Sequence, residues 1–208
     1  MPLLKVVPGA FSPSDLAPAV DALRAGGVVA FPTDTFYGLA VDPTQPAAVQ
    51  KIFAIKGRRQ GEALPVIAVS IEDVEQFSGP LAAPEARLAA RFWPGPLSIL
   101  LPAPANVDEA VHGGTGTLAV RVPAHPVARA LAGAFGAPIT ATSANRSGQP
   151  PARSAGELAW LDASVCVIDA GDAPGGAPST IVDVRTQPPR LVREGAVPWD
   201  RVLRSITP

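Results

Sequence analysis

The sequence predicts a single α/β domain in which helices pack on a twisted mixed β-sheet. Three observations predict it: 47% of the 208 residues are apolar, apolar runs of strand length alternate with segments of helical periodicity, and no internal repeat or long linker divides the chain. A chain of this length can bury a substantial core as one domain. We therefore expect one domain over residues 1–208, with its core over residues 10–198.

The helices and strands follow from this periodicity and from the residues that begin and end each element. Helices are expected at residues 14–25, 47–56, 84–93, 125–135 and 154–160, and a further short helix is expected after Ser70. Strands are expected at residues 27–32, 64–70, 97–102, 117–123, 137–143, 165–170, 179–184 and 190–194. Ser154 and Glu157 match a capping box at the start of the last helix, as do Ser70 and Asp73 in the short one.

Composition excludes several classes of protein. The formal net charge of −1 gives no global basic surface for nucleic acid, so any RNA contact must be local. The single cysteine, Cys166, excludes an internal disulfide and is expected as a buried strand thiol. No apolar run approaches the roughly 18 residues of a membrane span, and the N-terminus lacks the pattern of a signal peptide. A cytoplasmic protein is predicted.

The stretch FPTDTFYGLA places three hydroxyls and a carboxylate, those of Thr33, Asp34, Thr35 and Tyr37, directly after an apolar run. Two interpretations stay open. In a turn, Asp and Thr side chains bond to nearby backbone and Gly38 supplies a positive φ. In a ligand site, the same groups line a strand end, where α/β folds bind their ligands.

A second cluster lies in IKGRR, where Lys56 and Arg58 follow a helical run. Lys provides a point charge and Arg a planar bidentate fork, so the pair suits phosphate, although a solvated surface is the alternative. No P-loop pattern is present. In TATSANRSGQPP, Ser143 has neither nucleophile pattern around it. Ser143 and Asn145 are better suited to hold phosphate or carboxylate oxygens.

The chain resembles the YrdC-like family of threonylcarbamoyl-adenylate synthases over about residues 10–198. The resemblance is carried by the stretches PTDTFYGLAVD, KIFAIKGR, FWPGPLSILLP, TLAVRVPAHP, ATSANRSGQPP, STIVDV and LVREG, in this order and spacing. It implies a twisted α/β domain with a large open cavity. It also implies that threonine, bicarbonate and ATP become threonylcarbamoyl-AMP and pyrophosphate, the first step of threonylcarbamoyladenosine modification of tRNA.

The resemblance assigns a tetrad of catalytic and ATP-binding residues that match the family's KxR and SxN motifs. These residues are Lys56, Arg58, Ser143 and Asn145. They would hold the phosphates and the reacting carboxylate. ATP is expected to bring Mg²⁺ with it, and no metal site of the protein's own is expected.

The resemblance also assigns the remaining substrate contacts. Thr35, Arg121 and Ser179 would bind threonine, with Arg121 pairing with its carboxylate. Thr117 and Arg193 would lie near ATP. The implied partners are a downstream threonylcarbamoyl-transferase complex and, as a candidate, tRNA; no membrane partner is expected.

The chain departs from the family's pattern at four positions. Arg59 replaces a proline, Glu62 stands where Asn or Lys is common, Ile67 replaces a strand histidine, and Glu194 turns a terminal RPG motif into REG. The length is typical of the short, single-domain form. Two alternative functions stay open: a transferase that forms a carbamoyl-adenylate, and a non-enzymatic RNA-binding paralogue.

Overall fold

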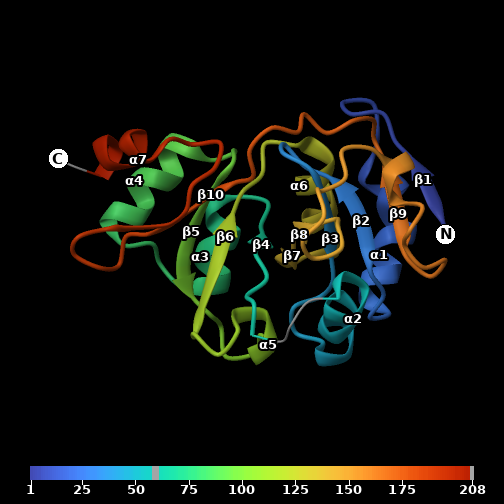
Figure 1. Cartoon of the computed structure of the whole chain (residues 1–208), viewed down its shortest axis with the longest axis horizontal. Helices are drawn as coiled ribbons and strands as arrows, with labels where there is room; N and C mark the ends of the chain where they lie inside the picture. The colour runs from blue at the N-terminus through green and yellow to red at the C-terminus, as the bar shows by residue number, and fades with distance from the viewer. Residues whose placement is uncertain (58–60, 207–208) are drawn as a thin grey trace.

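A computed structural model describes residues 1–57 and 61–206 and contains two mixed β-sheets with helices packed around them (Figure 1). The first sheet has the strand order β1-β9-β2-β3-β8. Its strands are β1 (Leu3–Lys5), β2 (Val29–Pro32), β3 (Tyr37–Ala40), β8 (Thr142–Ser143) and β9 (Cys166–Asp169). The pairs β1–β9 and β2–β9 are parallel, and β2–β3 and β3–β8 are antiparallel.

The second sheet has the strand order β11-β10-β5-β6-β4-β7. Its strands are β4 (Val66–Ile67), β5 (Leu97–Pro102), β6 (Thr117–Arg121), β7 (Ile139–Thr140), β10 (Thr180–Asp183) and β11 (Arg190–Arg193). Parallel pairs (β5–β10 and β4–β6) alternate with antiparallel ones (β10–β11, β5–β6 and β4–β7). The mixed α/β class predicted from the sequence is thus confirmed, with the strands divided between two sheets.

The helices are α1 (Ala17–Arg24), α2 (Pro46–Lys56), α3 (Ile71–Ser78), α4 (Ala83–Phe92), α5 (Glu109–His112), α6 (Pro126–Phe135) and α7 (Trp199–Ile206), with 3-10 turns at Pro13–Leu16 and Ala155–Leu158. All but α5 and α7 lie close to their expected positions, and the helix expected at residues 154–160 is the second of the 3-10 turns. Ser70 caps α3 as expected, because its Oγ accepts from the amide of Asp73 at 3.2 Å. Among the helices of the described residues, none is long and apolar enough to cross a membrane.

Two hydrophobic clusters hold the sheets and helices together. One is built around α1, α6, β2 and β9, where Leu23, Phe31 and Leu131 are fully buried. Cys166 belongs to this cluster, and its burial raises the pKa of the thiol, which confirms the expected buried strand position. The other cluster is larger and includes Ile99 of the second sheet.

The two sheets meet where the chain passes from β7 to β8. The sequence predicted one strand over residues 137–143, but Ala141 interrupts it. Thr140 pairs with Val66 of the second sheet, and Thr142 pairs with Leu39 of the first. The amide of Ala141 donates to the carbonyl of Pro65 at 2.7 Å, so the break itself is hydrogen-bonded. A seam between the sheets results.

Candidate functional site

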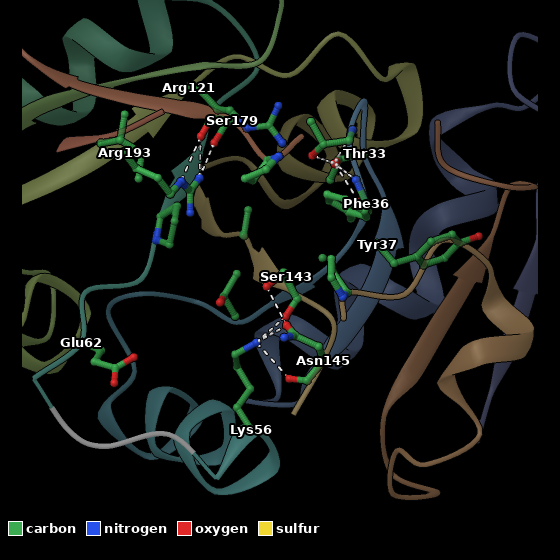
Figure 2. Close-up of a pocket in the computed structure, with 18 of the residues that line it drawn as sticks. Thr33, Phe36, Tyr37, Lys56, Glu62, Arg121, Ser143, Asn145, Ser179 and Arg193 are labelled. Atoms are coloured by element: carbon green, nitrogen blue, oxygen red, sulfur yellow. Dashed lines mark hydrogen bonds between the residues drawn. The ribbon is translucent and has the colours of Figure 1, made fainter. Parts of the chain in front are cut away.

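A cavity of about 690 Å³ opens at this seam, and residues from both sheets and from the C-terminus of α2 line it (Figure 2). The predicted site residues that line it are Thr35, Lys56, Arg121, Ser143, Asn145, Ser179 and Arg193. In Figure 2, Lys56 and Asn145 lie at one side of the cavity, and Ser179 and Arg193 lie at the other. Segments far apart in the sequence therefore form two facing walls.

The segment after β2 is a turn and a wall of the cavity at once. Thr33 builds the turn: its hydroxyl donates to the carbonyl of Phe36 at 2.7 Å and accepts from the amide of Thr35 at 3.1 Å. The hydroxyls of Thr33 and Thr35 lie 3.1 Å apart, and both residues line the cavity. The two interpretations of this stretch are thus compatible, because local turn bonds present Thr35 to the cavity.

Tyr37 and Gly38 have structural roles. The Tyr37 hydroxyl donates to the carbonyl of Gly171 at 2.8 Å, and burial raises the pKa of this phenol to about 12. Its side chain points away from the cavity in Figure 2. The prediction of a positive φ at Gly38 is wrong, because Gly38 lies in β3 and is not among the glycines with a positive φ. A Cβ there would lie 3.3 Å from the ring of Phe31, so the close approach of that ring favours glycine.

Lys56 is the last residue of α2 and is only 4% exposed. Its ammonium donates to the backbone carbonyls of Ser143 and Asn145, the latter at 3.0 Å, and to Asn145 Oδ1 at 2.9 Å. A buried cation requires such oxygen partners. Lys56 therefore shapes the loop after β8 in addition to bringing positive charge to the cavity.

Hydrogen bonds within the loop after β8 fix its remaining polar groups. Ser143 Oγ donates to Asn145 Oδ1 at 2.6 Å, and Asn145 Nδ2 donates to the carbonyl of Gln149 at 2.6 Å. The amide of Ser147 donates to the carbonyl of Lys56 at 2.8 Å. Ser143 has no histidine partner among these contacts, which favours a role in holding oxygens over one as a nucleophile.

The opposite wall places two arginines beside Ser179. Arg193 Nη2 donates to the carbonyl and to the hydroxyl of Ser179, at 2.7 and 3.0 Å. Ser98, fully buried in β5, lies 3.1 Å from the same hydroxyl. Arg121, at the end of β6, donates to Asp34 at 2.5 Å. Ser179 is thus held from two sides, and both guanidinium groups are oriented by protein contacts.

Positive charge dominates the described lining of the cavity. Lys56, Arg121 and Arg193 are cationic, and Glu62 is the carboxylate that faces them. Hydroxyls and amides supply the other polar groups. Such a lining can bind phosphate and carboxylate groups through charge-assisted hydrogen bonds and can stabilise negative charge that develops during phosphoryl transfer.

Several positions named from the sequence lie elsewhere. Thr117 is not among the described lining residues, and its hydroxyl lies 3.1 Å from that of Thr115. Ile67 is fully buried in the cluster around α1 and α6. Glu194 is exposed next to β11. Arg58 and Arg59 fall outside the described residues, so their roles stay predictions.

Some residues that line the cavity, and one that supports its wall, were not predicted from the sequence. Ser147 and Gly148 line the cavity from the turn that follows Asn145. The stretch SANRSGQPP indicated them, because small and polar residues continue there beyond Asn145. Ser98 was hidden in the apolar run LSILLP, although a single hydroxyl in a buried strand requires a partner. That partner is Ser179.

The chain is similar to known proteins over most of its length. A family model named Sua5_yciO_yrdC and described as "Telomere recombination" matches residues 21–195. A threonylcarbamoyl-AMP synthase of Pyrococcus abyssi is 38% identical over 90% of this chain and 56% of its own length. One from Alkalilimnicola ehrlichii is 49% identical over 65% of this chain and 70% of its own length.

The fold of the chain is also similar to that of a solved structure. Pyrococcus abyssi Sua5 complexed with L-threonine superposes with a TM-score of 0.90 and 35% identity, over 99% of this chain and 61% of that one. The chain therefore spans little more than half the length of its Pyrococcus relative. Across the part that it spans, the family model, the sequence identity and the fold agree. The chain belongs to the Sua5/YciO/YrdC family.

Proposed function

We propose that this chain forms threonylcarbamoyl-AMP and pyrophosphate from L-threonine, bicarbonate and ATP, and that the cavity at the seam is its active site. The observation that carries the proposal is the opposition of two walls: Lys56 with the Ser143–Asn145 loop on one, and Arg121 with Ser179 and Arg193 on the other. Relatives named for this activity and the Pyrococcus structure with threonine support it.

The reaction needs proximity and positive charge and no protein nucleophile. Bicarbonate takes up a proton and loses water to give carbon dioxide. The amine of threonine then adds to the carbon dioxide, which gives a carbamate and releases a proton. A carbamate oxygen then attacks the α-phosphorus of ATP, and the bond from that phosphorus to the β-phosphate oxygen breaks to release pyrophosphate. The cationic lining would neutralise the triphosphate as charge moves to the leaving group.

Each reactant would be held chiefly by one wall. Arg121 and Ser179, with Thr35, would bind threonine, and Arg121 has the bidentate geometry that a carboxylate prefers. Lys56, Ser143 and Asn145 would hold phosphate oxygens, with Arg193 approaching from β11. Arg58 and Thr117 are further proposed ATP contacts that the described cavity does not include.

Mg²⁺ would enter with the nucleotide. Magnesium prefers oxygen ligands and is often bound through substrate phosphates. The described part of the chain contains no group of three His, Cys, Asp or Glu side chains suited to a metal, and Glu62 is the carboxylate among the described lining residues. The residues therefore fit an ion carried by ATP better than one held in a protein cage.

The test is a pyrophosphate-release assay with each substrate omitted in turn. We expect release to require threonine, bicarbonate and ATP together, with serine a much poorer substrate. Turnover that is equal with serine, or independent of bicarbonate, would contradict the proposal. Release that requires carbamoyl phosphate instead would favour the carbamoyl-adenylate alternative. A threonylcarbamoyl-transferase, acting on tRNA in the cytoplasm, is the proposed consumer of the product.

RNA binding is a second candidate, favoured by one observation. Arg87, Arg91, Arg201 and Arg204 surround a cavity of about 690 Å³ between α4 and α7, which pack side by side (Figure 1). Clustered arginines bind phosphate backbones in a salt-dependent manner. Titration of labelled tRNA at several salt concentrations tests this, with Arg91→Glu expected to abolish binding. An unchanged affinity in that variant would contradict RNA binding at this surface.

A further inference from the structure

Asp34 and Arg121 form a buried ion pair across the seam. Asp34 belongs to the turn between β2 and β3 of the first sheet, and Arg121 ends β6 of the second. Arg121 Nη1 lies 2.5 Å from Asp34 Oδ1, and the two side chains are 6% and 12% exposed. Charge-assisted bonds of this kind are short and strong. The pair therefore connects the two sheets beside the cavity.

The ion pair restrains one nitrogen of the guanidinium and leaves its other donors available. A guanidinium carries five N–H donors in a rigid planar fork. Among the described residues, the Asp34 bond is the hydrogen bond found for the Arg121 side chain. Arg121 lines the cavity and Asp34 does not. Asp34 can thus direct hydrogen-bond donors toward a bound ligand only through Arg121.

Asp34 Oδ2 is buried and makes no hydrogen bond among the described residues, and the same is true of Nδ1 of His125. The negative charge of Asp34 acts on this imidazole. A buried carboxylate with one bonded oxygen is costly for stability, so its presence calls for a functional explanation. The hydrogen bond to Arg121 is the contact that can offset this loss of stability.

We propose that Asp34 is a positioning residue that holds the guanidinium of Arg121 in the orientation that receives the carboxylate of the amino-acid substrate. This role rests on the function proposed above. A competing electrostatic effect has the opposite sign, because the charge of Asp34 repels a substrate carboxylate. The direction of the change in threonine affinity therefore decides between positioning and mere repulsion.

The first experiment compares threonine with threoninamide, which lacks the charged carboxylate. Calorimetry on the unsubstituted protein is expected to show a preference for threonine of tenfold or more, on the order of one bidentate contact. Asp34→Asn, which keeps the size of the side chain, is expected to reduce threonine affinity about tenfold. The same variant should bind threoninamide and ATP within about twofold of the unsubstituted protein.

Two outcomes would overturn the role of Asp34. Threonine affinity that is unchanged or tighter in Asp34→Asn contradicts positioning, whereas equal losses for threonine, threoninamide and ATP indicate a purely structural role. Failure of the unsubstituted protein to bind threonine contradicts the proposed function itself, and the role of Asp34 with it. Asp42→Asn is the matched control, because Asp42 bonds Thr44 in a turn outside the cavity.

Because Asp34→Asn leaves Arg121 buried without its counter-charge, this variant can lose stability. A double-mutant cycle with Arg121→Gln keeps the test decisive, since the double variant contains neither charge. If Asp34 acts through Arg121, threonine affinity in Asp34→Asn/Arg121→Gln equals that in Arg121→Gln alone. A further tenfold loss in the double variant would contradict positioning through Arg121.

Discussion

Arg193 holds Ser179 at both oxygens: Nη2 lies 2.7 Å from the carbonyl and 3.0 Å from the hydroxyl. Hydrogen bonds to charged groups contribute about 1.5–3 kcal/mol each. The position of Ser179 in the cavity wall thus depends on a residue of the neighbouring strand β11.

Arg193→Ala is therefore expected to weaken threonine binding by about tenfold or more. Isothermal calorimetry measures this loss directly, and ATP affinity should fall as well if Arg193 approaches the nucleotide. Arg190→Ala, on the same strand and outside the described lining, is expected to bind both ligands normally. Unchanged threonine affinity in Arg193→Ala would show that Ser179 is held without it.

Lys56→Met is expected to lower both turnover and stability. The substitution removes the ammonium that donates to the carbonyls of Ser143 and Asn145 and to Asn145 Oδ1. A hydrogen bond to a charged group contributes about 1.5–3 kcal/mol, which chemical denaturation can resolve. Lys51→Met on the same helix, where the lysine bonds Gly26, should leave turnover unchanged. If Lys56→Met lost turnover with full stability, the lysine would act on substrate alone.

Gly195→Ala is expected to displace the segment around Ser179. A Cβ at this position would lie 2.7 Å from the carbonyl carbon of Ser179 and 2.8 Å from the amide nitrogen of Thr180, both closer than real Cβ contacts. Backbone atoms cannot move aside as a flexible side chain can. A lower unfolding temperature and weaker threonine binding should follow. Gly156→Ala, whose Cβ would make only an ordinary contact with Ser154 Oγ at 3.8 Å, serves as control.

His125 is expected to titrate below the ordinary value of about 6.5. Burial lowers the pKa of His125, the charge of Asp34 raises it, and Arg129 lowers it. The chain has two histidines, so imidazole NMR signals can be assigned with His112→Gln. Asp34→Asn removes the raising charge and should lower the pKa of His125 further. A pKa at or above about 6.5 would contradict burial as the main cause.

The same shift sets the sign of a stability change. Because the folded pKa of His125 is depressed, the unfolded state binds more protons between that pKa and about 6.5, and the free energy of unfolding falls as pH falls through this range. His125→Gln should flatten this decline, as denaturation measured from pH 7 to 5 can show. An equally steep decline in the variant would assign the pH dependence to other groups.

Sequence patterns predicted the long regular elements well and the short ones poorly. The strand expected at residues 97–102 is β5 itself, and the helix expected at 47–56 differs from α2 by one residue. The strand expected at 64–70 shrinks to Val66–Ile67. Its pairing partners β6 and β7 set that limit, which no local apolar run reveals. The short helices α5 and α7 were missed because their apolar periodicity covers barely two turns or less.

The sequence predicted which residues belong to the candidate site, but it did not predict the contacts between them. Thr35, Lys56 and Arg121 line one cavity as the resemblance implied. That Lys56 braces the loop after β8, and that Asp34 faces Arg121, depends on contacts between residues far apart in the chain. Such tertiary contacts leave no periodic trace in a sequence.

Ala141 alone separates β7 from β8, so the chain leaves one sheet and enters the other within a single residue. Lys56, Ser143 and Asn145 gather at one wall of the seam, and Arg121, Ser179 and Arg193 gather at the other. Neither sheet by itself carries a complete set of binding groups. A designer who wished to transplant this cavity into another scaffold would have to move both sheets together with the crossing between them.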